Sequence, residues 1–288
     1  MRHRFNHFLW SCNINIKCYI YAVFLSLLIN AHSSAAIFGD GNPANGIEDQ
    51  RLLAPNKLQH SVGTIICDGG LRGTAVHVVT SNNNPNQQRS IILTAAHILY
   101  HPDTHERYEK CAYHPQGKRL NGIAFAKVSA HDFRPTINNK MVQAIEDIVF
   151  IALKKKLRYS GMKLNLTGQN SSQLQLLGFN ESQNNISMSI DCRPFLSRQF
   201  VSAQLLLHDC DAGRGASGGP LIDAKTGVVV GIHGGTLLFS PPGTKKIHAT
   251  AGAFANPETL INQARKIDVN VLTKLREFTA YPAKGFQY

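Results

Sequence analysis

Short apolar runs rich in β-branched residues, separated by turn sequences, most strongly limit what this chain of 288 residues can fold into. Turn sequences such as Asp68-Gly69-Gly70 punctuate these runs. The runs are Ser61–Cys67, Gly73–Thr80, Ile91–Ala95, Gly122–Ser129, Ile148–Leu153, Gln173–Phe179, Ile186–Asp191, Ser202–His208, Pro220–Asp223, Gly227–His233 and His248–Phe254. Many short strands with few helical periods predict an all-β sandwich or barrel.

The runs fall into two sets joined by a basic, polar connector over residues 154–167. We therefore expect two β domains, over residues 57–158 and 159–254. Beyond them Asn256 can cap a helix that has Pro257 at its first position. Helical periods over Glu258–Arg265 and Val271–Phe278 predict a C-terminal helical segment within residues 255–288.

The N-terminus has the pattern of a secretory signal peptide. Arg2, Arg4 and Lys17 precede a largely apolar run over residues 18–29, and small residues follow it. We predict cleavage after Ala36, which leaves residues 37–56 as a mature N-terminal segment or a short pro-segment. A membrane anchor is the alternative, but this run is short of the roughly 20 residues that span a bilayer. The protein is therefore expected to be secreted or periplasmic, without stable membrane insertion once residues 1–36 are removed.

Four cysteines remain in the predicted mature chain: Cys67, Cys111, Cys192 and Cys210. In an oxidising compartment they would form two disulfides, for which three connectivities exist. Cys192 and Cys210 flank one predicted hairpin, while Cys67 and Cys111 flank the region around His97, so we predict the pairs 67–111 and 192–210. A metal site is the alternative, but no C-x-x-C spacing is present, and no metal is expected.

The predicted mature chain carries 27 basic and 18 acidic residues, a net charge of +9. Such a charge favours anionic surfaces as partners. The basic run Lys154–Lys156 is short and is not interleaved with aromatic residues, so nucleic-acid binding is not expected. A solvated cationic surface is the simpler interpretation.

Ser217 lies in a glycine-rich stretch, H-D-C-D-A-G-R-G-A-S-G-G-P, over His208–Pro220. A serine hydroxyl becomes a useful nucleophile when a base takes its proton and N–H groups stabilise the oxyanion that it creates. Glycines allow the tight turn and the close backbone approach that this chemistry needs. The N–H groups of Gly215 and Ser217 can point at one oxygen, which makes the loop a candidate nucleophile with its oxyanion hole. A glycine-rich turn without chemistry is the alternative.

Two further motifs can supply the partners of Ser217. His97 ends L-T-A-A-H directly after an apolar run, where an imidazole can be held rigidly as a general base. Asp147 opens D-I-V-F-I-A-L at the edge of another apolar run, where a carboxylate can orient that imidazole. The adjacent Glu146 would point the other way from a strand. The candidate triad is therefore His97, Asp147 and Ser217.

L-T-A-A-H, D-I-V-F-I-A-L and G-A-S-G-G-P, in this order, resemble the motifs of the chymotrypsin-fold serine endopeptidases over roughly Gly63–Phe254. Each motif is weak alone, but all three in the family's order are specific. Within that clan the chain is most similar to the bacterial glutamyl endopeptidases. The shared features are E-D-Q-R at residues 48–51, G-I-H-G-G at residues 231–235 and a C-terminal helix.

The resemblance implies two six-stranded antiparallel β-barrels, followed by the C-terminal helix. His97 and Asp147 would come from the N-terminal barrel and Ser217 from the C-terminal one. Residues 231–235 would pair with extended substrate backbone. Because the chemistry is acyl transfer through an acyl-enzyme, it requires no cofactor.

Two residues compete as determinants of substrate specificity. His233 matches the histidine that helps glutamyl endopeptidases hold an acidic side chain, whereas Asp211 lies where trypsins place the aspartate that attracts Lys or Arg. Hydrogen bonding within the loop for Asp211, and packing near Cys210 for His233, are the structural alternatives. The preferred side chain stays open. Ala216 stands where trypsins carry the aspartate that receives a new N-terminal ammonium, so activation by that ion pair is not expected.

Together these observations predict a monomeric, exported serine endopeptidase that acts on protein or peptide substrates. The alternative is a catalytically silent cationic binding protein on the same fold. A substituted triad or a damaged oxyanion loop would favour that alternative, and the sequence shows neither.

Overall fold

The computed structural model describes residues 36–38, 51–80, 89–118, 122–166, 171–181, 183–196, 202–238 and 260–280. The predicted signal peptide (apart from Ala36), residues 48–50 of the E-D-Q-R segment, the predicted strand 248–254 and the helix start at Asn256 lie outside them. Within these ranges, no helix has the length and apolar character needed to cross a membrane.

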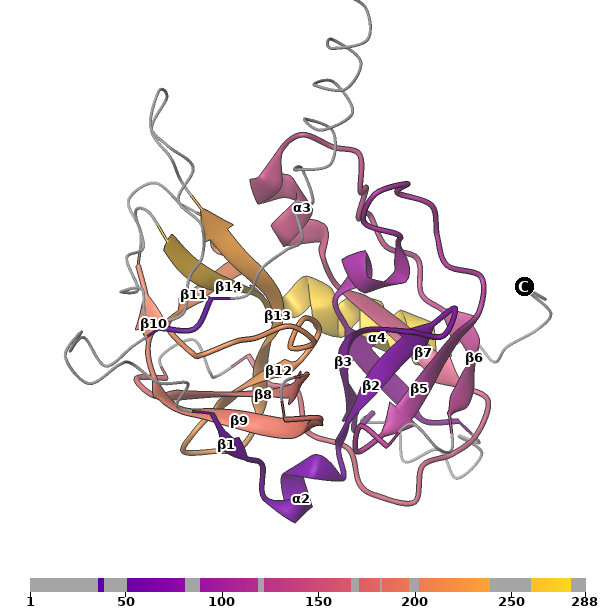
Figure 1. The fold of residues 1–288 in the computed structure, drawn as a ribbon, viewed down its shortest axis with the longest axis horizontal. Helices are drawn as coiled ribbons and strands as arrows, with labels where there is room; N and C mark the ends of the chain where they lie inside the picture. Colours follow the sequence, from indigo (N-terminus) through magenta and orange to yellow (C-terminus); the bar gives the residue numbers. More distant parts are fainter. Residues whose placement is uncertain are drawn as a thin grey trace, which may run out of the picture. The chain divides into compact units, whose positions relative to one another are not determined.

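The N-terminal strands form a closed antiparallel barrel, as the sequence predicts (Figure 1). The barrel strands carry completely buried side chains, among them Ile65, Leu93 and Ile151. Such β-branched and apolar residues suit a pleated surface that is covered on one side. In barrel order the strands are β2 (Val62–Cys67), β3 (Gly70–Val78), β4 (Ile91–Thr94), β7 (Val149–Leu153), β6 (Ile123–Val128) and β5 (Cys111–Pro115).

The C-terminal strands, joined by β1 from the N-terminal segment, form an eight-stranded antiparallel sheet that is not closed, in contrast to the second six-stranded barrel that was expected. Its outermost strands have two residues each, and Pro194 in one of them has no N–H to donate. Edges this short do not close the sheet. In sheet order the strands are β1 (Leu52–Leu53), β9 (Asn185–Cys192), β8 (Leu174–Asn180), β12 (Pro220–Asp223), β13 (Val229–Leu238), β14 (Leu260–Lys266), β11 (Leu205–His208) and β10 (Pro194–Phe195).

The helix predicted over Glu258–Arg265 is wrong, because Leu260–Lys266 is the strand β14. β14 pairs with β13 on one side and with β11 on the other, and most of its side chains are buried. A helix here would lose both sets of hydrogen bonds together with this burial. Tertiary pairing therefore overrides a weak local helical preference.

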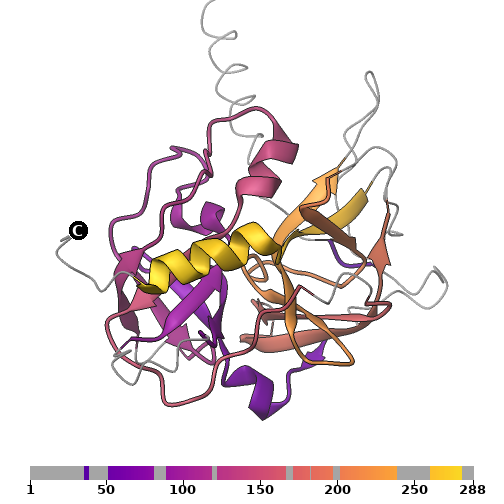
Figure 2. The same ribbon diagram turned by 180° about the vertical axis from the view of Figure 1, so that it is seen from behind.

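The second predicted helix, over Val271–Phe278, is confirmed as α4 (Val269–Ala280). Seen from behind, α4 runs from the end of β14 across the outside of the barrel (Figure 2). The ring of Phe278 stacks at 6.3 Å from that of Phe150 in β7, and Lys274 forms a 2.9 Å ion pair with Asp132. The C-terminal helix thus fastens the open sheet to the barrel.

Three short helical elements were not predicted: α2 (Asn56–Gln59), the 3-10 turn η1 (Ala96–Leu99) and α3 (Lys140–Glu146). The side chain of Asn139 caps α3, because its Oδ1 accepts the N–H groups of Met141 and Val142. An asparagine at this position is the sequence feature that could have predicted the start of α3. This helix matters for the site because it ends immediately before Asp147.

The structure contains the disulfides Cys67–Cys111 and Cys192–Cys210, the same pairs that were predicted. The first joins the end of β2 to the start of β5 within the barrel. The second joins the end of β9 to the loop after β11, seven residues before Ser217.

Candidate active site

His97 and Asp147 are joined by two hydrogen bonds. The imidazole Nδ1 lies 2.6 Å from Asp147 Oδ2, and the main-chain N–H of His97 donates to Asp147 Oδ1 at 2.8 Å. His97 sits on η1 between buried neighbours at the end of β4, and Asp147 links α3 to β7. Two rigid elements of the barrel therefore hold the pair, and the carboxylate sets both the tautomer and the orientation of the ring.

The surroundings of His97 make its imidazole more basic than usual. Asp147 is buried, whereas the His97 side chain is 23 % exposed. Burial by itself would lower the pKa of His97, but the charge of Asp147 and the hydrogen bond to it more than offset this effect and raise the pKa. His97 is thus suited to take up a proton from a neighbouring hydroxyl.

The backbone around Ser217 is anchored to both sheets. The N–H of Thr74 in β3 donates to the carbonyl of Ser217 at 2.7 Å, and the N–H of Gly218 donates to the carbonyl of His233 in β13 at 2.7 Å. A Cβ at Gly73 would lie 2.5 Å from the Ser217 carbonyl oxygen and 3.0 Å from Cγ2 of Ile98, the neighbour of His97. Glycine at position 73 therefore lets the serine loop lie against the histidine turn.

A second glycine brings β13 against Asp147. A Cβ at Gly234 would lie 3.1 Å from Asp147 Oδ2. β13 therefore contacts the Ser217 loop through the carbonyl of His233, and its next residue, Gly234, lies against the Asp147 carboxylate. The structure thus brings all three predicted triad residues to one region. Among the described residues, no hydrogen bond joins Ser217 Oγ to His97, and such catalytic bonds often form only when substrate binds.

The chain makes a tight turn at Gly215 in the loop before Ser217. Gly215 has φ +96°, a conformation that suits glycine, and its carbonyl accepts the Thr74 hydroxyl at 2.6 Å. The N–H of Ala216 donates to Gly213 at 3.1 Å. Within the described ranges, the N–H groups of Gly215 and Ser217 meet no acceptor.

The two predicted specificity residues are both buried, but they differ in their contacts. Asp211 Oδ1 accepts the N–H of Phe38 at 2.7 Å, and the N–H of Asp211 donates to the Ser189 hydroxyl at 2.8 Å. One carboxylate oxygen is therefore already bonded to the protein's own main chain. Phe38 itself packs with Ala36 and Leu260.

His233 is paired with a histidine that the sequence reasoning missed. His233 Nδ1 lies 3.3 Å from His208 Nε2, and both rings are fully buried. Burial first, and the charge of His97 second, lower the pKa of His233 to about 3, and burial also holds the pKa of His208 well below its usual value. Both rings are therefore neutral. The sequence feature that could have identified His208 is its position at the end of an apolar run, directly before D-C-D.

Among the residues that the structure describes, no group of three or more His, Cys, Asp or Glu side chains is arranged to hold a metal ion.

Solved structures with a similar fold have low sequence identity to this chain. A Glu endopeptidase is 14 % identical with a TM-score of 0.54 and covers 81 % of this chain and 98 % of its own. Neuropsin, a serine protease of mouse brain, is 16 % identical (TM-score 0.55; 80 % and 99 %), and human heparin binding protein is 12 % identical (0.54; 82 % and 99 %). At these identities the likeness concerns the fold alone. No curated protein matches the chain.

The sequence pattern of the trypsin-like peptidase domain matches residues 73–232. This range runs from β3 into β13 and contains His97, Asp147 and Ser217. Because the match covers more than half of the chain, and the fold agrees with it, the protein belongs to the trypsin-like peptidase family of chymotrypsin-fold serine peptidases.

Proposed function

We propose that the protein is an exported serine endopeptidase that cleaves peptide bonds through an acyl-enzyme. Ser217 is the nucleophile, His97 the general base and then the general acid, and Asp147 the residue that orients the imidazole. The observation that carries this proposal is the contact of both Asp147 oxygens with His97, at 2.6 and 2.8 Å. A carboxylate bound in this way stabilises the imidazolium that forms during attack.

In the proposed reaction, His97 takes the proton of the Ser217 hydroxyl as its oxygen attacks the substrate carbonyl. The oxyanion that develops would accept the N–H groups of Gly215 and Ser217, which have no other acceptor within the described ranges. His97 then gives its proton to the leaving amine. Water hydrolyses the acyl-enzyme by the same route in reverse.

Export is supported by the chemistry of the cysteines. Disulfides persist in oxidising compartments, and the structure contains two of them. The signal-peptide pattern over residues 1–36 points the same way. We therefore propose a secreted or periplasmic protein whose substrates are proteins or peptides.

The test is covalent labelling of the purified chain, lacking residues 1–36, with a fluorophosphonate. We expect labelling of the wild type and its loss in Ser217→Ala. Ser187→Ala is the matched control, because Ser187 is also buried but lies on β9, where its hydroxyl donates to the Gly178 carbonyl at 3.3 Å. Absence of labelling in the folded wild type would favour the cationic binding protein instead.

A further inference from the structure

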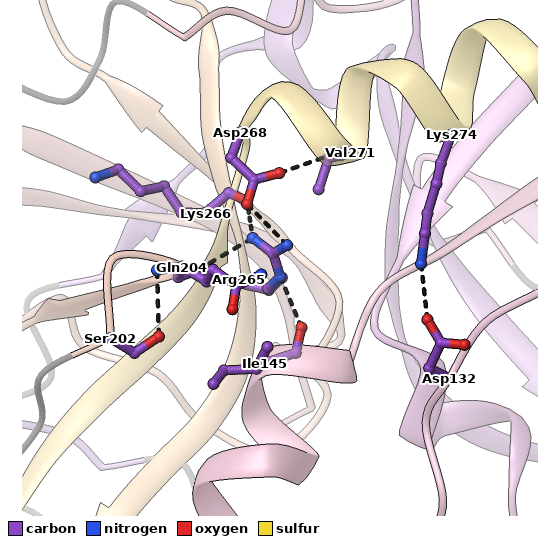
Figure 3. A network of polar contacts seen from close by, with 9 residues as sticks. All are labelled: Asp132, Ile145, Ser202, Gln204, Arg265, Lys266, Asp268, Val271 and Lys274. Carbon is purple, nitrogen blue, oxygen red and sulfur yellow. Dashed lines mark hydrogen bonds and ion pairs between the residues drawn. The ribbon is translucent and has the colours of Figure 1, made fainter.

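Arg265 carries a buried charge next to the candidate active site. It lies on β14, and only 5 % of its side chain is exposed. A charged group is costly to bury unless its donors are satisfied and its charge is paired. Figure 3 shows where these donors go: the guanidinium points between the start of α4 and the end of α3.

All three guanidinium nitrogens of Arg265 have partners, and the partners come from separate segments. Nε donates to the Ile145 carbonyl at 2.7 Å, and Nη1 donates to the carbonyls of Lys266 at 2.7 Å and Gln204 at 3.2 Å. Nη2 forms a 2.9 Å ion pair with Asp268, whose other oxygen accepts the Val271 N–H at the start of α4 (Figure 3). The planar fork of arginine suits such a junction, and a lysine could not reproduce it.

The contact with Ile145 leads directly to the triad. Ile145 belongs to the last turn of α3, where helix carbonyls lack partners within the helix and favour a positive charge nearby. Asp147 follows two residues later, and its own backbone, at φ −81°, ψ 61°, is no longer helical. The position of this turn therefore determines where the Asp147 carboxylate lies.

Asp147 has little freedom to move without loss of function. Both of its oxygens bond to His97, so a shift of the α3 end would lengthen both bonds together. Catalytic groups must be held within roughly 0.5 Å of their productive positions. The α3 end also contacts Arg134 through Glu146 at 3.8 Å, but the Arg134 side chain is exposed, whereas Arg265 is buried.

We propose that Arg265 is a positioning residue for the peptidase: its guanidinium fixes the end of α3, and thereby holds Asp147 against His97. This inference rests on the proposed function, since it assigns Asp147 to the triad. Arg265 acts through Ile145 and does not contact substrate.

The test compares Arg265→Met, Arg265→Lys and Asp268→Asn with the control Lys274→Met. The control also removes a contact of α4, the exposed ion pair with Asp132, and leaves the bonds of Arg265 to Ile145 and Asp268 intact. We would measure kcat and KM, and the magnetic resonance signal of the Nδ1 proton of protonated His97. That proton is strongly deshielded in a short bond to a carboxylate. The spectra would be recorded in the Ser217→Ala background.

We expect Arg265→Met to lower kcat by about 10- to 100-fold with KM nearly unchanged, as a displaced catalytic group does. The deshielded proton should be lost or shifted. The kcat and the proton signal of Arg265→Lys and Asp268→Asn should lie between those of Arg265→Met and those of the control. These two milder variants keep the test valid if Arg265→Met does not fold. Wild-type kcat and an unshifted proton in both of these milder variants would overturn the proposal.

The spectrum separates this inference from the proposed function. The proton signal depends on the contact between His97 and Asp147 and not on hydrolysis. If the wild type is not labelled by fluorophosphonate, the proposed function fails. A signal that still disappears in Arg265→Met would nevertheless show that Arg265 positions Asp147.

Discussion

The bonds between His97 and Asp147 make a residue-level prediction about pH. Although burial opposes it, the charge and hydrogen bond of Asp147 raise the pKa of His97. Since general-base catalysis needs the neutral ring, activity should fall as the pH drops through this raised pKa. Asp147→Asn should lower kcat by about 10⁴-fold, the loss known for this change in another His-Asp-Ser triad.

The measurement is the pH dependence of kcat/KM for wild type and Asp147→Asn on one peptide substrate. The acid limb of the variant should move to lower pH, because the carboxylate that raised the pKa is gone. A far-ultraviolet circular dichroism spectrum like that of the wild type would confirm that the variant is folded. An unshifted acid limb would show that Asp147 does not interact with the catalytic base.

His233 and Asp211 make opposite predictions about the substrate. Asp211 already binds the Phe38 N–H, while His233 is neutral at ordinary pH. Its Nδ1 faces His208, which leaves the other ring nitrogen to donate to an acidic side chain. We expect preferred cleavage after Glu, reduced about 10- to 100-fold in His233→Ala, the size of one hydrogen bond to a charged group.

Cleavage of a peptide library by wild type, His233→Ala and Asp211→Asn decides between the two residues. We expect Asp211→Asn to keep the preference for Glu, because the amide oxygen can still accept the Phe38 N–H. Cleavage after Lys or Arg that disappears in Asp211→Asn would contradict this interpretation and assign specificity to Asp211.

At the level of elements, apolar runs in the sequence predicted most strands of the barrel, because each run is long enough to be buried. β14 could not be predicted this way. Polar residues interrupt it: Asn262, Gln263 and Arg265 are buried, and Asn262 and Arg265 bond to the distant Cys210 and Ile145 carbonyls. The candidate triad was inferred from local motifs, whereas the α3 end that we propose to place Asp147 contacts Arg265, which is 120 residues from Ile145 in sequence. The sequence had no local signal for that contact.

The disulfides belong to different elements and should contribute differently. Cys67–Cys111 closes a loop with a sequence separation of 44, and Cys192–Cys210 one of 18. From loop-closure entropy, replacing each pair by alanine should lower the free energy of unfolding by about 4 and about 3 kcal/mol, respectively.

Denaturant unfolding of the two double variants measures this difference, and fluorophosphonate labelling measures its effect on the site. Only the loss of Cys192–Cys210 should slow labelling of Ser217 in the folded protein, because Cys210 immediately precedes the Asp211–Ser217 loop. Equal slowing in both double variants would contradict this assignment.

For the molecule as a whole, buried neutral histidines predict sensitivity to acid. Burial lowers the pKa of His77 to about 4, and burial with the charge of His97 lowers that of His233 to about 3. Below the unfolded value of about 6.5, the unfolded chain binds protons that the folded chain does not. Each such histidine therefore costs about 1.4 kcal/mol of stability per pH unit as the pH falls. His97 contributes to stability in the opposite direction. Because its pKa is raised in the folded state, it stabilises the folded protein at low pH, and this contribution is lost as the pH rises through the raised pKa.

The free energy of unfolding of the Ser217→Ala protein should consequently decrease between pH 6 and pH 5. His77→Gln should reduce this slope by about 1.4 kcal/mol per pH unit, since one of the buried rings no longer has to stay neutral. The exposed His105, at φ 62°, provides the control His105→Asn, because asparagine tolerates that conformation. If both variants kept the slope of the parent, acid sensitivity would have to come from groups other than His77, and the burial of this ring in β3 would not be what limits stability at low pH.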